Sequence, residues 1–71
     1  MRIEAPLHFL PAFELVARHL SIKRAAVQLG LTGSAVSQQV RALEEALGVK
    51  LLRRMTRALA LTPEGEQFAR V

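Results

Sequence analysis

Hydrophobic residues recur at helical spacing in successive segments of this 71-residue chain, with capping or turn-forming residues between them. In the first segment, residues 8–19, the apolar side chains form one stripe. Pro11 indicates that the regular helix begins nearer Leu10, because proline fits only the first turn of a helix. The second segment, residues 22–29, has a narrow apolar side with small alanines, and Ser21 before it is a typical N-cap. These patterns predict two amphipathic helices that share a core.

A sharp corner is predicted between the second helix and a third. Gly30 suits the left-handed conformation that ends a helix, and Thr32 is placed to cap the helix that follows. The third helix is expected to run from residue 33 or 34 to residue 47. Its buried side is predicted to carry Val36, Val40, Leu43 and Leu47. Its outer face is predicted to carry Ser34, Gln38, Arg41 and Glu45, with Ser37 on the flank.

Beyond Gly48 the pattern changes from helical spacing to alternation. Leucines alternate with alanines over residues 58–61, which predicts two short strands joined by a turn around residues 55–57. Thr62 and Pro63 then have the residue types of a cap and a first helical position. The expected fold is mainly α, a winged helix-turn-helix with three core helices and a two-stranded wing over residues 1–61. Residues 62–71 are expected to begin a longer linker helix.

The charge distribution favours an anionic partner. Ten Lys and Arg residues against six Asp and Glu give a net charge of +4. No carboxylate occurs between Glu14 and Glu44, and only basic residues carry charge between Glu45 and Glu64. An ordinary solvated surface is the alternative interpretation of these runs. The chain has no cysteine and no long apolar segment, which predicts a cytoplasmic domain without disulfides or membrane contact.

The first two turns of the third helix contain no acidic residue. An acid near the N-terminus of an exposed helix is favoured by about 0.3–1 kcal/mol, so its absence indicates another requirement. A helix end that approaches phosphates would exclude carboxylates, and serine and glutamine can hydrogen-bond base edges. We therefore predict a helix-turn-helix that binds double-stranded DNA. A plain three-helix packing unit and a winged-helix module that binds protein are the alternatives.

No catalytic or cofactor-binding constellation is predicted. His8 and His19 lie about 16 Å apart if they share one helix, too far to bind the same metal ion. No serine has a base with an orienting acid nearby in the sequence, and no glycine-rich phosphate loop is present. The sequence thus predicts a binding domain with no enzyme activity and no cofactor.

A long ordered stretch, AFELVARHLSIKRAAVQLGLTGSAVSQQVRALEEALGVKLLRR, is followed by Arg57 and by LTPEGE. With the predicted order of elements, it resembles the N-terminal winged helix-turn-helix domain of the LysR-type transcriptional regulators. The resemblance covers nearly the whole chain. Gly33 stands where many members have proline, and Pro11 stands where a polar helix former is common.

This resemblance implies sequence-specific DNA binding with the third helix in the major groove. Three of its residues would approach bases, namely Ser34, Ser37 and Gln38. Arg57 in the wing would enter the minor groove. Three residues would contact or support the DNA backbone, namely Thr32, Arg41 and Arg54.

The resemblance also implies partners other than DNA. Family members pair through the linker helix, so a homodimer on a pseudo-palindromic operator is expected, and a tetramer in a full-length regulator. A larger C-terminal domain, which these 71 residues do not include, would bind a small-molecule effector.

Overall fold

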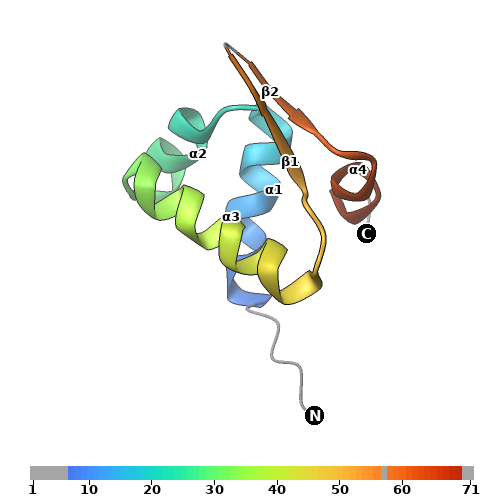
Figure 1. Cartoon of the computed structure of the whole chain (residues 1–71). Coiled ribbons are helices and arrows are strands. Elements are labelled where there is room, and N and C mark those ends of the chain that lie inside the picture. Colours follow the sequence, from blue (N-terminus) through green and yellow to red (C-terminus); the bar gives the residue numbers. More distant parts are fainter. Residues whose placement is uncertain (1–6, 57, 70–71) are drawn as a thin grey trace.

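The computed structural model describes residues 7–56 and 58–69, in which three helices precede a hairpin and a fourth helix (Figure 1). The elements are a 3-10 turn at Leu7–Phe9, α1 at Leu10–His19, α2 at Ile22–Leu29, α3 at Gly33–Leu47, β1 at Leu52–Met55, β2 at Ala58–Leu61 and α4 at Pro63–Ala69. The predicted mainly helical fold with a two-stranded wing is confirmed. None of the helices in these ranges is long and apolar enough to cross a membrane.

The predicted caps position α2 and α3. The Ser21 hydroxyl accepts a hydrogen bond from the Arg24 amide at 3.1 Å, and the Thr32 hydroxyl accepts one from the Ala35 amide at 3.1 Å. Between the two helices Gly30 adopts a φ of 69°. Its left-handed backbone ends α2, so that α3 can begin three residues later. The predicted corner is confirmed.

A second left-handed residue, Leu20, was not predicted. It has φ 49° and ψ 41° and ends α1, with its amide donating to the Val16 carbonyl. Left-handed backbone is unfavourable for a residue with a Cβ. The chain must nevertheless reverse here, because Ser21 directly after it already caps α2.

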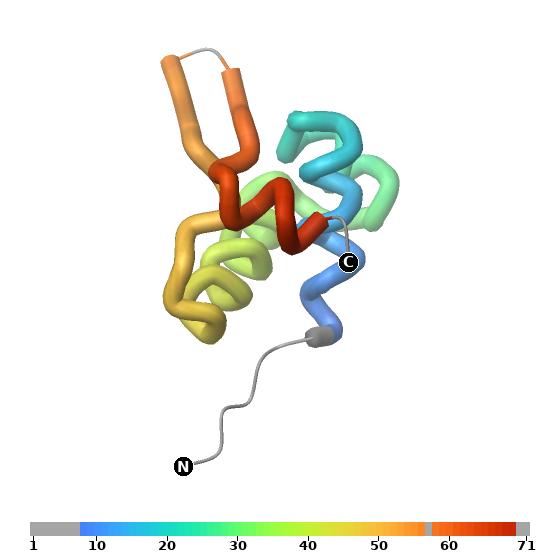
Figure 2. Tube along the Cα trace, turned by 90° about the vertical axis from the view of Figure 1, so that its right-hand side faces the viewer, coloured from blue at the N-terminus to red at the C-terminus, as the bar shows by residue number. Residues whose placement is uncertain are grey.

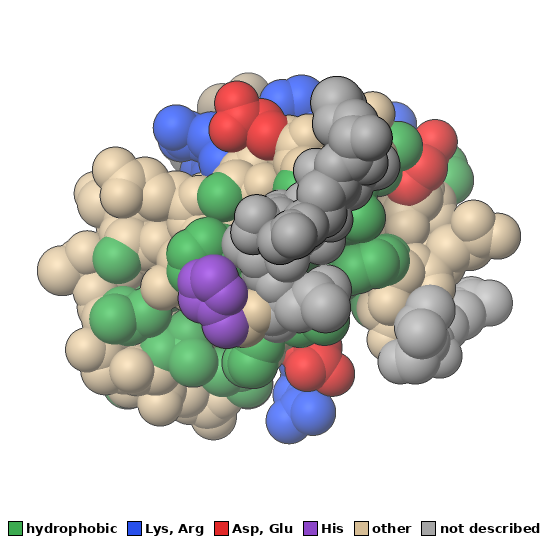
Figure 3. All heavy atoms as spheres, turned by 90° about the horizontal axis from the view of Figure 1, so that it is seen from below, with side chains coloured by type: hydrophobic (Ala, Val, Ile, Leu, Met, Phe, Trp, Pro, Cys, Tyr) green, Lys and Arg blue, Asp and Glu red, His purple; other side chains and the backbone are tan. Residues whose placement is uncertain are grey.

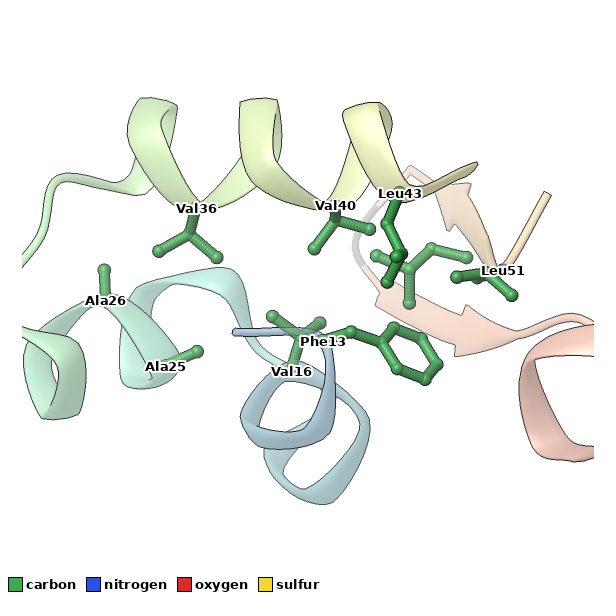
Figure 4. Close-up of a cluster of buried hydrophobic side chains, with 9 residues drawn as sticks. Phe13, Val16, Ala25, Ala26, Val36, Val40, Leu43 and Leu51 are labelled. Carbon is green, nitrogen blue, oxygen red and sulfur yellow. The ribbon is translucent and has the colours of Figure 1, made fainter. Parts of the chain in front are cut away.

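The core lies where α3 crosses α1 and α2 (Figure 4). Val36, Val40 and Leu43 point from α3 toward the other two helices, and all three are buried. Small Ala25 and Ala26 on α2 let that helix approach α3 closely. The other buried members are Phe13 and Val16 from α1, together with Leu51 and Leu52. Leu47, which was predicted on the same side of α3, is only partly buried.

The hairpin extends beyond the helices, and α4 returns to pack on α1 (Figure 2). β1 and β2 are antiparallel, with Leu52 opposite Leu61 and Met55 opposite Ala58. The Phe68 ring of α4 lies 5.7 Å from the Phe13 ring, centroid to centroid. This contact ties the fourth helix to the core.

The cap of α2 gives a test of these local contacts. Ser21→Ala removes the hydroxyl that accepts from the Arg24 amide, and we expect a loss of about 1 kcal/mol in the free energy of unfolding. Ser21→Gly should cost only a few tenths of a kcal/mol, because glycine leaves that amide open to water. Urea denaturation followed by circular dichroism measures both, and equal losses would contradict a capping role.

Candidate nucleic-acid interface

The outer face of α3 is exposed as predicted. Ser34, Gln38 and Arg41 are all exposed, and they lie on the side opposite the buried valines. This sorting follows from the 3.6-residue period of the helix. Three of the predicted site residues therefore share one accessible surface.

The N-terminal end of α3 carries no carboxylate. Its first turn has no acidic residue. Its cap Thr32 is exposed, and the Thr32 hydroxyl accepts a hydrogen bond from the Ala35 amide. The remaining amides of the first turn have no partner within the helix, so this end carries partial positive charge. A negatively charged group is favoured there.

Ser37 and Arg54 come together although they lie 17 positions apart in the sequence. Arg54 Nη2 donates a hydrogen bond to Ser37 Oγ at 3.2 Å. Ser37 is half-buried on the flank of α3, and Arg54 is exposed on β1. The wing and the third helix thus form one continuous surface through two predicted site residues.

A hollow of about 350 Å³ lies between α3 and the wing. Arg41 from α3 and Arg54 from β1 both line it, together with Lys50, which the sequence analysis did not select. Glu44 also lines the hollow, so three cationic side chains against one carboxylate leave a net positive charge, which favours an anionic partner there. The sequence signal for Lys50 was its place in the basic run between Glu45 and Glu64.

Glu44 is the principal residue that sequence reasoning missed. It is buried, and its Oε2 accepts hydrogen bonds from the amides of Leu51, at 2.8 Å, and Leu52, at 3.1 Å. It lies seven positions after Ser37, and therefore two turns along the same flank of α3. Ser37 and Glu44 together fix the wing strand alongside the third helix. Their seven-residue spacing was the feature of the sequence that could have indicated this shared role.

Thr62 holds the same segment from the opposite side. Its hydroxyl donates to the Lys50 carbonyl at 2.5 Å and accepts from the Gly65 amide at 2.9 Å. Its own amide donates to the Leu51 carbonyl at 3.1 Å. The predicted cap of α4 is confirmed, and it also fastens the base of the wing.

The predicted site residue Arg57 lies outside the described residues. The side of the molecule away from the hairpin shows several hydrophobic side chains, with both basic and acidic side chains near its edge (Figure 3). The basic and polar groups described above instead lie on α3 and the wing.

Across residues 7–56 and 58–69, no three His, Asp or Glu side chains are grouped to hold a metal ion.

Comparisons with known proteins agree with this architecture. A family model described as bacterial regulatory helix-turn-helix protein, lysR family, matches residues 7–66. The chain is 54% identical over 68 residues to the transcriptional activator AmpR of Pseudomonas aeruginosa, covering 96% of this chain and 23% of that protein. It is 51% identical over 63 residues to the glycine cleavage system transcriptional activator of Escherichia coli K12, covering 89% of this chain and 21% of that protein.

Solved structures give the same result. The fold matches the BenM DNA-binding domain in its complex with catB site 1 DNA, with a TM-score of 0.84 and 38% identity over 90% of this chain and 71% of that one. It matches OxyR of Corynebacterium glutamicum with a TM-score of 0.87 and 35% identity, over 97% of this chain and 23% of that one. The chain spans about a quarter or less of the curated relatives cited above. The chain belongs to the LysR family of bacterial regulatory helix-turn-helix proteins.

Proposed function

We propose that this chain is the DNA-binding domain of a LysR-type transcriptional regulator and that it reads a specific double-stranded sequence. One observation carries the proposal, namely the exposed outer face of α3, which is acid-free over its first two turns and begins at an electropositive helix end. The BenM relative, whose structure is of a DNA complex, supports it. In this arrangement α3 lies in the major groove and the wing reaches the adjacent minor groove.

Within this proposal the site residues have two kinds of role. Residues that hydrogen-bond base edges determine sequence, and cationic or capping residues fix the position on the phosphate backbone. The base-reading residues are Ser34, Ser37 and Gln38. The backbone residues are Thr32, Arg41 and Arg54. Arg57 is assigned to the minor groove from its place in the sequence.

The domain is proposed to act as a pair. Two copies joined through the helix that begins with α4 at Pro63 would occupy the half-sites of a pseudo-palindromic operator, because a two-fold protein fits a two-fold site. In a full-length regulator, tetramers and control by a small-molecule effector are part of the same proposal. The DNA-binding domain itself is proposed to have no catalytic role.

Selection from random duplexes tests this function. The purified chain should enrich one half-site, and paired half-sites at a fixed spacing if it dimerises. Affinity should fall steeply with salt, with a log–log slope of about −0.9 for each phosphate contact. Gln38→Ala should change the preferred base at one or two positions, whereas Arg57→Ala should weaken binding and alter mainly the A·T preference beside the half-site.

A different set of results would favour the protein-interaction alternative. If binding to duplexes is weak, flat with salt and without sequence preference, the winged helix presents this surface to another protein. If Gln38→Ala lowers affinity equally for every duplex, Gln38 contacts the backbone and its base-reading role is wrong.

A further inference from the structure

The hydrogen bond between Arg54 and Ser37 constrains what Ser37 can recognise. A guanidinium group has donors only, whereas a serine hydroxyl has one hydrogen to donate and two lone pairs that accept. In the bond at 3.2 Å, Arg54 Nη2 is therefore the donor and Ser37 Oγ the acceptor. One lone pair of Ser37 is occupied, and its hydrogen stays available.

The usual internal partner of a serine within a helix is the carbonyl four residues earlier. For Ser37 that carbonyl belongs to Gly33. Among the residues that the structure describes, no backbone carbonyl accepts from Ser37, and its side chain bonds to Arg54 alone. The neighbouring positive charge polarises the hydroxyl and makes it a better donor.

We propose that Arg54 biases the hydrogen bonding of Ser37, so that Ser37 donates to acceptor atoms on a base edge and guanine is preferred over cytosine opposite it. This inference rests on the proposed DNA-binding function. In the major groove guanine presents two acceptors, N7 and O6, and adenine and thymine present one each, N7 and O4, whereas cytosine presents an amino donor. Ser37 can donate to guanine, whereas the amino group of cytosine would have to approach the remaining lone pair of Ser37 next to the Arg54 charge, which disfavours a second donor.

The placement of Arg54 on the hairpin allows this role. In the β1–β2 register Arg54 pairs with Leu59, and Leu52 pairs with Leu61. These four side chains share one face of the hairpin, because residues two apart on a strand point the same way. Both Leu59 and Leu61 pack against the core, so this face is turned toward the helices and carries Arg54 to α3.

Arg54 can hold Ser37 and still contact DNA. Its guanidinium has five N–H donors, of which the bond to Ser37 uses one. The remaining donors are available to a phosphate oxygen. The assigned backbone role of Arg54 and the positioning role proposed here are therefore compatible.

The test compares two adjacent arginines on the same strand. Arg53 pairs with Ala60 and points to the opposite face of the hairpin, so Arg53→Met removes the same charge without touching Ser37. We expect Arg54→Met to reduce the guanine-over-cytosine preference by about two- to tenfold, the usual worth of one hydrogen bond. The affected position is the one whose preference Ser37→Ala abolishes. Arg53→Met should leave the preference at every position as in the unmodified chain.

Random-duplex selection, followed by titration of single-base variants of the selected site, measures these preferences. In the Ser37→Ala background, Arg54→Met should cause no further change at that position, because the group that it positions is gone. Circular dichroism confirms that each variant folds, and Ser37→Thr, which retains a hydroxyl, should keep the preference.

Two results would overturn the inference while leaving the proposed function intact. In the first, Arg54→Met weakens binding to all duplexes equally and leaves the base preferences unchanged. In the second, Ser37→Ala changes no base preference. If the unmodified chain selects no sequence at all, the proposed function and this inference fail together.

Discussion

Gly65→Ala is expected to destabilise the domain by about 3 kcal/mol, at the upper end of the usual cost of overpacking. A Cβ on Gly65 would overlap the carbonyl oxygen of Leu51 and press on the backbone around it. Neither partner can yield easily, since that carbonyl also accepts from the Thr62 amide, and Thr62 caps α4. The whole domain is expected to have only about 5 kcal/mol of stability. The loss should therefore lower Tm by more than about 10 °C.

Gly33 provides the matched control for this substitution. It also lies in the first turn of a helix, and a Cβ there would meet only the Ile22 side chain at an ordinary 3.7 Å. Gly33→Ala should leave Tm unchanged or raise it, because alanine favours the helix by about 0.5–1 kcal/mol over glycine. Thermal melts of both variants settle the point, and equal melting temperatures would show that α4 can move away from Leu51 at little cost.

Glu44→Ala is expected to cost a similar amount, about 3 kcal/mol, because it leaves the amides of Leu51 and Leu52 without their acceptor. Both amides donate to one oxygen, Oε2. The amide oxygen of Glu44→Gln can take its place, although without the charge that roughly doubles such a bond. We therefore expect an intermediate loss of about 1 kcal/mol for Glu44→Gln.

The adjacent acid Glu45 provides a control, because its substitution shows how much stability changes when a negative charge on α3 is removed without loss of the bonds to Leu51 and Leu52. Glu45 is exposed on the outer face of α3, and Glu45→Ala should change stability by less than about 0.5 kcal/mol. Urea denaturation of the three variants gives the order. If Glu44→Ala and Glu45→Ala prove equally mild, the two amides find other partners and the carboxylate does not hold the wing.

Features that depend on residues three or four positions apart were predictable from the sequence. The periodicity of α3 correctly placed Val36, Val40 and Leu43 inside and Ser34, Gln38 and Arg41 outside. Caps follow the same local logic, since a side chain that bonds an amide three residues later needs no knowledge of the rest of the fold. The outer surface of the candidate site was predictable for this reason.

The contacts that join α3 to the wing were not predictable in this way. In the sequence Glu44 only marks the end of a stretch without carboxylates, whereas its burial depends on where the segment before β1 lies. The approach of Gly65 to Leu51 and the bond between Arg54 and Ser37 likewise join separate elements. The left-handed backbone at Leu20 was not predictable either, because the position is not occupied by glycine, the residue type that usually marks this conformation. Each depends on packing between elements, which periodicity does not encode.

Among the described residues, the hydrogen bonds that hold the hairpin to the helices reach from its base to Arg54 and no further, so its stiffness is uneven along its length. Glu44 and Thr62 clamp the backbone at its base, whereas Met55 near the other end is half exposed and Thr56 beyond it is exposed. A ribbon of two strands is only marginally stable without packing against other elements. Bending beyond Arg54 would leave the buried contacts of the helices undisturbed, so in the proposed DNA complex the wing would adapt to grooves of different width while α3 keeps its alignment.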